Sequence, residues 1–157
     1  MKNTLNNKKG FTLVELLAVI VVLAIIILVA MPNVMSAMEK ARRNTFYTEA
    51  TEICKIVQNA YNTDILDGKI AGGTSKCYSL SQLRDDGHMD KNLDGYSGSV
   101  YIQYTPGSDK AKTYIWISNK SYQYVKAECS LLGKKVGEGQ SDMQKYTADA
   151  ATNCPMS

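Results

Sequence analysis

The sequence predicts an α+β fold in which one long N-terminal helix packs against an antiparallel β-sheet. An uninterrupted apolar segment, residues 11–31, is followed by apolar residues at helical spacing as far as about residue 66. Alternating apolar and polar residues then predict strands between residues 99 and 128. Because a single layer cannot hide an apolar face from water, we expect the amphipathic part of the helix and the sheet to cover each other.

The apolar segment 11–31 is long enough to cross a lipid bilayer. At about 1.5 Å per helical residue it spans about 31 Å, close to the ~30 Å hydrocarbon core of a membrane. The leader before it, residues 1–10, is polar, and its charged residues are all lysines. Such a leader stays in the cytoplasm, so the rest of the chain is exported. A secretory signal is cleaved after its apolar core, whereas cleavage after Gly10 leaves the apolar segment attached as an anchor.

Glu15 is the one charged residue within this apolar segment. A carboxylate inside a membrane helix costs ~2.5–3.5 kcal/mol on insertion scales, so we expect a cation to meet it. Cleavage between Gly10 and Phe11 would create an amino group about one helical turn away, and in a stack of subunits a neighbour could supply the same group. The alternative is an ordinary signal anchor in which Glu15 lies near the membrane surface or is protonated.

The residues around this glutamate resemble the N-terminus of a type IV prepilin. The resemblance rests on the run KGFTLVEL at residues 9–16, followed by a purely apolar stretch and Pro32. It implies that a membrane prepilin peptidase removes the leader by cutting between Gly10 and Phe11, and that the new amino group of Phe11 is methylated. It also implies that a pilus assembly platform adds the mature chain to a helical filament of copies of itself, and that Glu15 neutralises the Phe11 amine of an adjacent subunit.

Pro32 opens the second part of the predicted helix, residues 32–66. Its missing N–H predicts a kink or local melting, and a boundary at the membrane surface is the alternative. The resemblance adds unwinding at this position in the assembled filament. Beyond Pro32, apolar residues recur every three or four positions, and Asp67-Gly68 predicts the end of the helix. These apolar positions are Val34, Met38, Ala41, Thr45 or Phe46, Ala50, Ile53, Val57 and Ala60.

Residues 67–98 are rich in Gly, Ser, Asp and Asn and predict a connecting loop with one short helical turn near residues 79–85. Within this loop, oxygen-bearing side chains occupy the first, third and fifth positions of a calcium-binding loop. These are Asp90, Asn92 and Asp94. Position twelve is Tyr101 where such a loop carries a bidentate glutamate, so an ordinary turn is the alternative. No cofactor is predicted.

The alternation between residues 99 and 128 predicts an antiparallel meander. Its aliphatic residues should face the helix: Val100, Ile102, Ile115, Ile117, Val125 and Ala127. Its aromatic residues should occupy the other face: Tyr101, Tyr114, Trp116, Tyr122 and Tyr124. We expect the C-terminal region, 129–157, to cover this aromatic face, with a short helix that a capping box of Ser141 and Gln144 opens and that runs through Ala151. An exposed aromatic platform that binds sugars is the alternative.

All four cysteines lie on the exported side, where disulfides persist. They are Cys54, Cys77, Cys129 and Cys154. Four cysteines permit three pairings, and a buried free thiol or a zinc site also remains open. The family resemblance favours a disulfide between Cys129 and Cys154 around the C-terminal loop, which would contribute about 3 kcal/mol in the chain-entropy model. A second pair would then join Cys54 and Cys77.

Charge and motif content do not recommend nucleic-acid binding or catalysis. The formal net charge is +3, and removal of the leader with Lys2, Lys8 and Lys9 leaves 3 − 3 = 0. His88 is the only histidine, and no H-E-x-x-H, P-loop or G-x-S-x-G motif is present. We therefore do not expect an enzyme, and we expect the exported residues 32–157 to form one domain.

By resemblance, these features describe a structural subunit of a type IV pilus. The precursor would be a single-pass membrane protein, and the mature chain would form an extracellular filament for adhesion, surface motility or aggregation. A minor pilin or a type II secretion pseudopilin is the first alternative. A monomeric membrane-anchored adhesin is the second.

Overall fold

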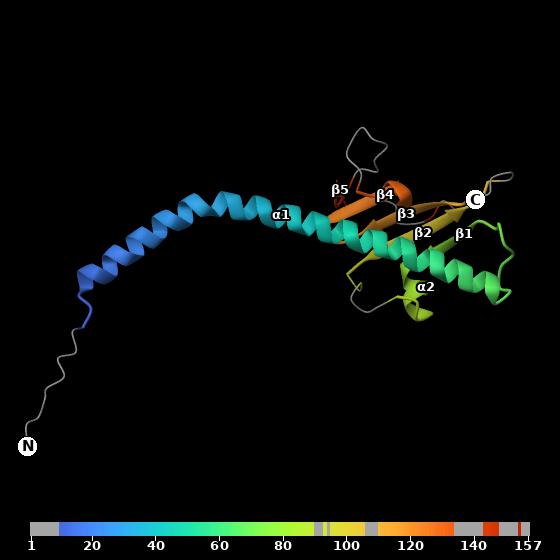
Figure 1. The fold of residues 1–157 in the computed structure, drawn as a ribbon, viewed down its shortest axis with the longest axis horizontal. Helices are drawn as coiled ribbons and strands as arrows, with labels where there is room; N and C mark the ends of the chain where they lie inside the picture. The colour runs from blue at the N-terminus through green and yellow to red at the C-terminus, as the bar shows by residue number, and fades with distance from the viewer. Residues whose placement is uncertain are drawn as a thin grey trace, which may run out of the picture. The chain divides into compact units, whose positions relative to one another are not determined.

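The computed structural model describes residues 10–89, 93, 95–105, 110–133, 143–147 and 154. The chain forms two compact units, Met1–Arg42 and Arg43–Ser157. The first helix, α1, runs from Leu13 to Leu66 and belongs to both units (Figure 1). Its bounds confirm the predicted long N-terminal helix.

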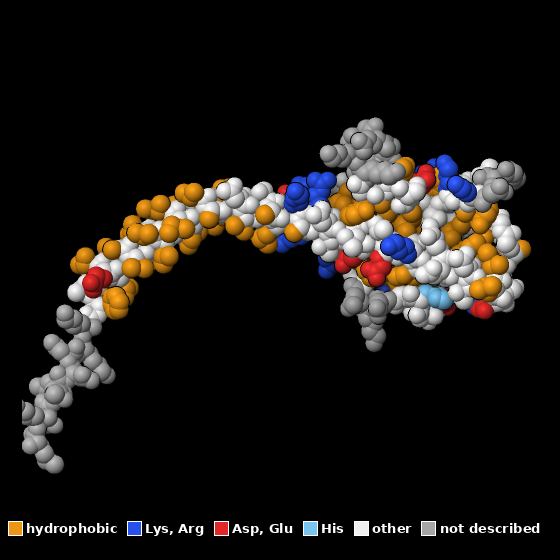
Figure 2. Space-filling model, viewed as in Figure 1, with side chains coloured by type: hydrophobic (Ala, Val, Ile, Leu, Met, Phe, Trp, Pro, Cys, Tyr) orange, Lys and Arg blue, Asp and Glu red, His pale blue; other side chains and the backbone are white. Residues whose placement is uncertain are grey.

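Between Leu13 and Met31, α1 is apolar on all sides apart from Glu15. Every large hydrophobic side chain between Phe11 and Met38 is more than half exposed, with exposed fractions from 51% to 86%. The most apolar window of α1 has a mean hydropathy of 3.3, and among the described residues α1 is the one helix long and apolar enough to cross a membrane. Figure 2 shows hydrophobic side chains covering this part of the helix. A helix that is apolar all round needs lipid or other protein around it.

Pro32 lies inside α1, and helical backbone continues on both sides of it. Proline has no N–H to donate to the carbonyl of Leu28, four residues earlier. The helix nevertheless continues, so the local melting predicted at Pro32 is not present in this structure. Unwinding of this segment within an assembled filament stays a prediction.

The second unit contains a five-stranded antiparallel sheet in the order β1-β2-β3-β4-β5. Its strands are β1 (Lys76–Ser79), β2 (Ser97–Gln103), β3 (Lys112–Ser118), β4 (Tyr122–Glu128) and β5 (Gln144–Lys145). A short helix, α2 (Leu80–Asp85), follows β1, and a 3-10 helix, η2 (Cys129–Leu131), follows β4. The α+β fold is therefore confirmed, as is the short helix predicted near residues 79–85.

The two edge strands, β1 and β5, are not predicted by the sequence. β1 has four residues, of which only Tyr78 is buried, and β5 has two exposed residues. Segments this short show no readable alternation, and they become strands because β2 and β4 offer them open edges. The helix predicted from Ser141 through Ala151 is wrong at Gln144, which pairs with Gln123 as part of β5. Ser141 and Ala151 themselves lie outside the described residues.

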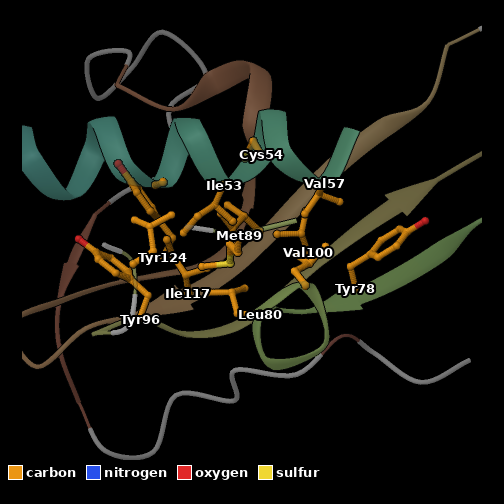
Figure 3. Packing of buried hydrophobic residues seen from close by; sticks show 14 of the residues in the cluster. Ile53, Cys54, Val57, Tyr78, Leu80, Met89, Tyr96, Val100, Ile117 and Tyr124 are labelled. Carbon is orange, nitrogen blue, oxygen red and sulfur yellow. The ribbon is translucent and has the colours of Figure 1, made fainter. Parts of the chain in front are cut away.

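The hydrophobic core of this unit lies between α1 and one face of the sheet (Figure 3). The side chains that α1 contributes with an exposed fraction of 0% are Phe46, Ala50, Ile53 and Val57. The sheet contributes Val100, Ile102, Ile115, Ile117 and Ala127, and α2 contributes Leu80 and Leu83. Ile53 and Val57 point from α1 toward Val100 and Ile117 (Figure 3). The predicted packing of the amphipathic half of the helix on the sheet is confirmed.

Because of a β-bulge in β4, three residues of this strand lie on the opposite face of the sheet from the one predicted. Ile117 of β3 pairs with Tyr124, and Ile115 pairs with Ala127, so β4 has an extra residue between these pairs. The bulge lies at Val125 and Lys126, and Lys126 has a φ of 54°. Strict alternation from Ala127 therefore assigns the β4 residues before the bulge to the wrong face of the sheet. Val125, predicted to be in the core, is 40% exposed.

Tyr122 and Tyr124, predicted on the outer face, lie on the core side instead. Their ring centroids are 5.8 Å and 5.3 Å from that of Phe46 on α1. Burial raises the pKa of Tyr124 to about 12. The bulge thus adds two aromatic rings to the contact between helix and sheet.

The outer face keeps Tyr101, Tyr114 and Trp116, as predicted, because they alternate with core residues in β2 and β3. Trp116 is only 6% exposed, which does not suit an exposed sugar-binding platform. The described C-terminal residues reach this side of β4: Gln123 donates to the Thr147 hydroxyl (3.1 Å) and accepts from the Thr147 N–H (3.2 Å).

Asp64 fastens the C-terminal end of α1 to β1. Its buried carboxylate accepts hydrogen bonds from Lys76 Nζ and from the Tyr78 hydroxyl, each at 2.7 Å. Lys69 Nζ lies 3.5 Å from the other carboxylate oxygen. The hydrogen bonds from Lys76 and Tyr78 hold the pKa of Asp64 below its ordinary value. Burial and the bond to Asp64 raise the pKa of Tyr78.

Candidate assembly site at the start of α1

The predicted cleavage site lies immediately before α1. Gly10 and Phe11 precede the first helical residue, Leu13, and the Phe11 side chain is 86% exposed. The Gly10–Phe11 bond is therefore in non-helical, exposed backbone, the kind of segment that a protease can bind.

Thr12 and Glu15 form a capping box at the start of α1. The Thr12 N–H and the Thr12 hydroxyl both donate to Oε2 of Glu15, at 2.8 Å and 2.9 Å. In return, the Glu15 N–H donates to the Thr12 hydroxyl oxygen at 3.3 Å. Reciprocal bonds of this kind satisfy backbone N–H groups that have no partner inside the helix. Thr12 is not among the site residues predicted from the sequence, although a Thr-x-x-Glu spacing directly before an apolar run is a signal for this capping box.

The capping box supplies two hydrogen-bond donors to the Glu15 carboxylate but leaves its charge in place. Both donors are neutral groups, and among the described residues no cationic side chain pairs with this carboxylate. The location in the first helical turn is favourable, because the helix dipole is positive there. The amine predicted to meet Glu15 is absent as long as the Gly10–Phe11 bond is intact.

Apolar side chains surround this carboxylate along the helix. Leu13, Val14 and Leu16 are 82%, 72% and 61% exposed. The charge therefore sits at one end of a surface that otherwise favours lipid or protein.

The disulfides differ from the predicted pairs. Cys54 on α1 is bonded to Cys129 after β4, and Cys77 on β1 is bonded to Cys154, with sequence separations of 75 and 77 residues. The predicted pairs, Cys129 with Cys154 and Cys54 with Cys77, are wrong in this structure. A free thiol or a zinc site built from these residues is also excluded, because all four cysteines are in disulfides.

Strand order explains why Cys129 does not reach Cys154. Cys154 is held at β1, whereas Cys129 follows β4, three strand spacings away in the sheet. At ~4.8 Å per spacing this is ~14 Å, about twice the distance that a disulfide can bridge between Cα atoms. Cys129 lies instead at the end of the sheet that faces Cys54 on α1, with Cα atoms 6.1 Å apart.

Among the described residues, no group of three or more His, Cys, Asp or Glu side chains could hold a metal ion. The calcium-loop residues Asp90, Asn92 and Asp94 lie outside the described part of the chain. His88 lines a polar cavity of about 330 Å³ between α1, β1 and α2. Lys69 and Lys76, which line the same cavity, are engaged with Asp64.

Comparison with known proteins identifies the N-terminal region. A family model described as the prokaryotic N-terminal methylation motif matches residues 5–31, a range that includes the Gly10–Phe11 bond, Thr12 and Glu15. No curated protein and no solved structure matches the chain. The matched motif is the type IV prepilin signature, and it implies processing by a prepilin peptidase and assembly into a pilus. This signature, followed by a long apolar helix and an α+β head, supports a type IV pilin-like protein.

Proposed function

We propose that this chain is a major type IV pilin, a structural subunit that polymerises through α1 into a surface filament. The observation that carries the proposal is one carboxylate, Glu15, at the start of an exposed apolar helix, for which the described part of the chain offers no cationic partner. A membrane anchor for a monomer needs only the apolar surface. It gains nothing from a charge that costs ~2.5–3.5 kcal/mol to insert, whereas a polymer can use that charge for subunit pairing.

Processing would supply the missing cation. Hydrolysis of the Gly10–Phe11 bond would release leader residues 1–10 and leave a free amino group on Phe11. Methylation replaces one hydrogen of this amine and keeps its positive charge. The Phe11 amine of one subunit could then pair with the Glu15 carboxylate of a neighbour.

The charge pair decides whether the helix leaves the membrane. Moving the apolar surface of α1 from lipid into a bundle of identical helices changes hydrophobic free energy little, because lipid tails are as apolar as these side chains. An unpaired carboxylate and an unpaired amine in such a bundle cost several kcal/mol each, whereas a hydrogen-bonded pair offsets most of that cost. Pairing of Glu15 with Phe11 would therefore favour correctly placed subunits.

The head would form the outer surface of the filament. Its core closes between α1 and the sheet, and two disulfides join segments that are far apart in the sequence. The segment 67–98 and the C-terminal region would lie at the filament surface, where the filament would serve adhesion, surface motility or aggregation.

The direct test is the analysis of material sheared from cells that express the full chain. We expect long filaments whose main protein begins at Phe11 and carries one methyl group, shown by intact mass and N-terminal sequencing. Trace amounts in filaments made mainly of another protein would identify a minor pilin, and short cell-bound fibres a pseudopilin. An intact Met1 and no fibres would contradict the proposal and favour a monomeric adhesin.

A further inference from the structure

We propose that three basic residues of α1 bind the phosphate groups of lipid headgroups while the chain is anchored in the membrane. They lie just beyond the apolar part of the helix and are named the basic collar: Lys40, Arg42 and Arg43. These contacts belong to the anchored precursor, so they go beyond the proposed filament and do not depend on polymerisation.

The basic collar follows directly on the exposed apolar side chains of α1. Val34, Met35 and Met38 are 53%, 66% and 51% exposed, so side chains that favour lipid continue past Met31. From Leu13 to Met38 the helix is about 39 Å long at ~1.5 Å per residue. This length exceeds the ~30 Å hydrocarbon core of a bilayer and approaches the ~40–45 Å that includes the headgroups. The basic collar would therefore lie at the level of the headgroups.

Helix geometry also directs these side chains toward the membrane. Side chains of an α-helix are tilted toward its N-terminus, and the N-terminal part of α1 is the part that lipid would surround. Long lysine and arginine side chains can extend further in that direction and place their charges among the phosphates. The basic collar can thus reach phosphate groups that lie closer to the bilayer centre than its own backbone.

The three side chains leave the helix in different directions. At about 100° per residue, Arg42 lies about 200° and Arg43 about 300° around the helix from Lys40. A protein that docks on one face of α1 would leave at least one of these charges without a partner. Headgroups surround an anchored helix on all sides, so the arrangement favours lipid over a single docked protein.

The charges of the basic collar are available for an external partner. All three residues are exposed, and none of the ion pairs within the described part of the chain involves them. Glu39 is the one carboxylate in residues 39–43, which leaves this turn with a net charge of 3 − 1 = +2. Phosphate groups carry the negative charge of a lipid surface, and arginine can bind a phosphate through two parallel N–H bonds.

The first test measures the distance from each arginine to lipid phosphorus. The full precursor is labelled with ¹³C at the guanidinium carbon of arginine and placed in phosphatidylcholine–phosphatidylglycerol bilayers in phosphate-free buffer. The chain has three arginines, Arg42, Arg43 and Arg84, and the variants Arg42→Gln and Arg43→Gln assign their signals. Arg84 is the internal control, because its guanidinium donates to the backbone carbonyls of Leu93 and Tyr96 within the head.

We expect solid-state ¹³C–³¹P recoupling to place Arg42 and Arg43 at ~4–5 Å from phosphorus, the separation across a charge-assisted hydrogen bond to a phosphate oxygen. The Arg84 signal should be unaffected. The proposal is overturned if neither arginine of the basic collar is close to phosphorus. It is also overturned if Arg84 is equally close, because the contact would then not be specific to the basic collar.

The second test includes Lys40 and measures affinity. Native mass spectrometry counts the phosphatidylglycerol molecules that stay bound to the full precursor released from mixed micelles. The collar variant carries Lys40→Gln, Arg42→Gln and Arg43→Gln. The control variant loses the same charge at three exposed lysines of the head: Lys55→Gln, Lys120→Gln and Lys145→Gln.

We expect the collar variant to bind phosphatidylglycerol at least about tenfold more weakly than the unmodified chain, because three attractive charges are lost where the lipid lies. The control variant should stay within about twofold. Equal losses in the two variants, or no loss in the collar variant, would contradict the proposal. Neither test requires filaments, so failure of the proposed pilin function would leave both expectations unchanged.

Discussion

The two halves of α1 belong to one helix but differ in how far their apolar side chains are exposed. Between Phe11 and Met38 the large hydrophobic side chains are all more than half exposed, whereas Phe46, Ile53 and Val57 are completely buried. The second half finds its cover in the sheet of the same chain. The first half needs lipid or other subunits. Measurements of stability should therefore report on the second half, and measurements of assembly on the first.

The largest effect on the head should come from removing the disulfide that ties its half of α1 to the sheet. Replacing both Cys54 and Cys129 by alanine should lower the free energy of unfolding by about 4 kcal/mol, because a long loop becomes free in the unfolded chain. Urea unfolding of the purified protein in detergent, followed by Trp116 fluorescence, measures this change. Peptide mapping without reductant should first show Cys54 linked to Cys129. A peptide linking Cys129 to Cys154 would show that the structure has the wrong pairing.

The same substitution in the two halves of α1 should have very different consequences. Ile53→Ala should cost about 3 kcal/mol of unfolding free energy, because it leaves a cavity in the core between helix and sheet. Ile26→Ala, at a side chain that is 56% exposed, should change this free energy by less than ~0.5 kcal/mol. The same urea titration measures both. Equal losses would mean that the two halves do not differ as described.

Asp64 should make the stability of the head depend on pH. Its pKa in the folded chain lies below the ordinary value of 3.8, so the unfolded chain binds this proton first as the pH falls. The stabilisation is present above about pH 5 and is lost as the pH falls through 4 and below. Asp64→Asn should cost about 2 kcal/mol at neutral pH and should flatten the acid side of the profile. Asp67→Asn, at an exposed partner of Lys69, is the control and should leave the profile unchanged.

The smallest effect should come from Val125, which the bulge moves out of the core. Val125→Thr should change the unfolding free energy by less than ~0.5 kcal/mol, because the side chain is 40% exposed. Val57→Thr places a hydroxyl in the core and should cost at least ~1 kcal/mol. If the two substitutions cost the same, the bulge is not where the structure places it.

Much of this fold follows from local periodicity. The helix from Leu13 to Leu66 is predictable because a long apolar segment is followed by apolar positions at a helical period, and its end is marked by Asp67-Gly68. The three longer strands are predictable because at least four successive residues alternate in each. In α1, β2 and β3 the pattern in the sequence and the packing in the structure have the same cause, whereas in β4 the bulge makes the alternation give the wrong faces.

The remaining parts depend on contacts between distant segments. β1 and β5 take their strand conformation from the edges that they join, and the bulge at Lys126 changes which side of β4 faces α1. The disulfide pairing follows from strand order, which four cysteine positions do not reveal. None of these features leaves a periodic signal in the sequence.

The residues of the candidate site also differ in whether the sequence alone identifies them. Gly10, Phe11 and Glu15 are identified by a contiguous motif, so the sequence is enough to nominate them. The contribution of Thr12 is clear only when its hydrogen bonds to Glu15 are seen. Its Thr-x-x-Glu spacing is a weaker signal, because capping boxes occur at the start of many helices.

The most direct test of the account is the replacement of the carboxylate by its neutral isostere, Glu15→Gln, in the full chain. Glu39→Gln, at an exposed glutamate further along α1, serves as the control. We expect the amount of Glu15→Gln chain in sheared filaments to fall about a hundredfold while the control is unaffected, because the Phe11 amine would be left without a partner in the filament core. Normal filaments from Glu15→Gln would contradict the central claim that this charge drives assembly.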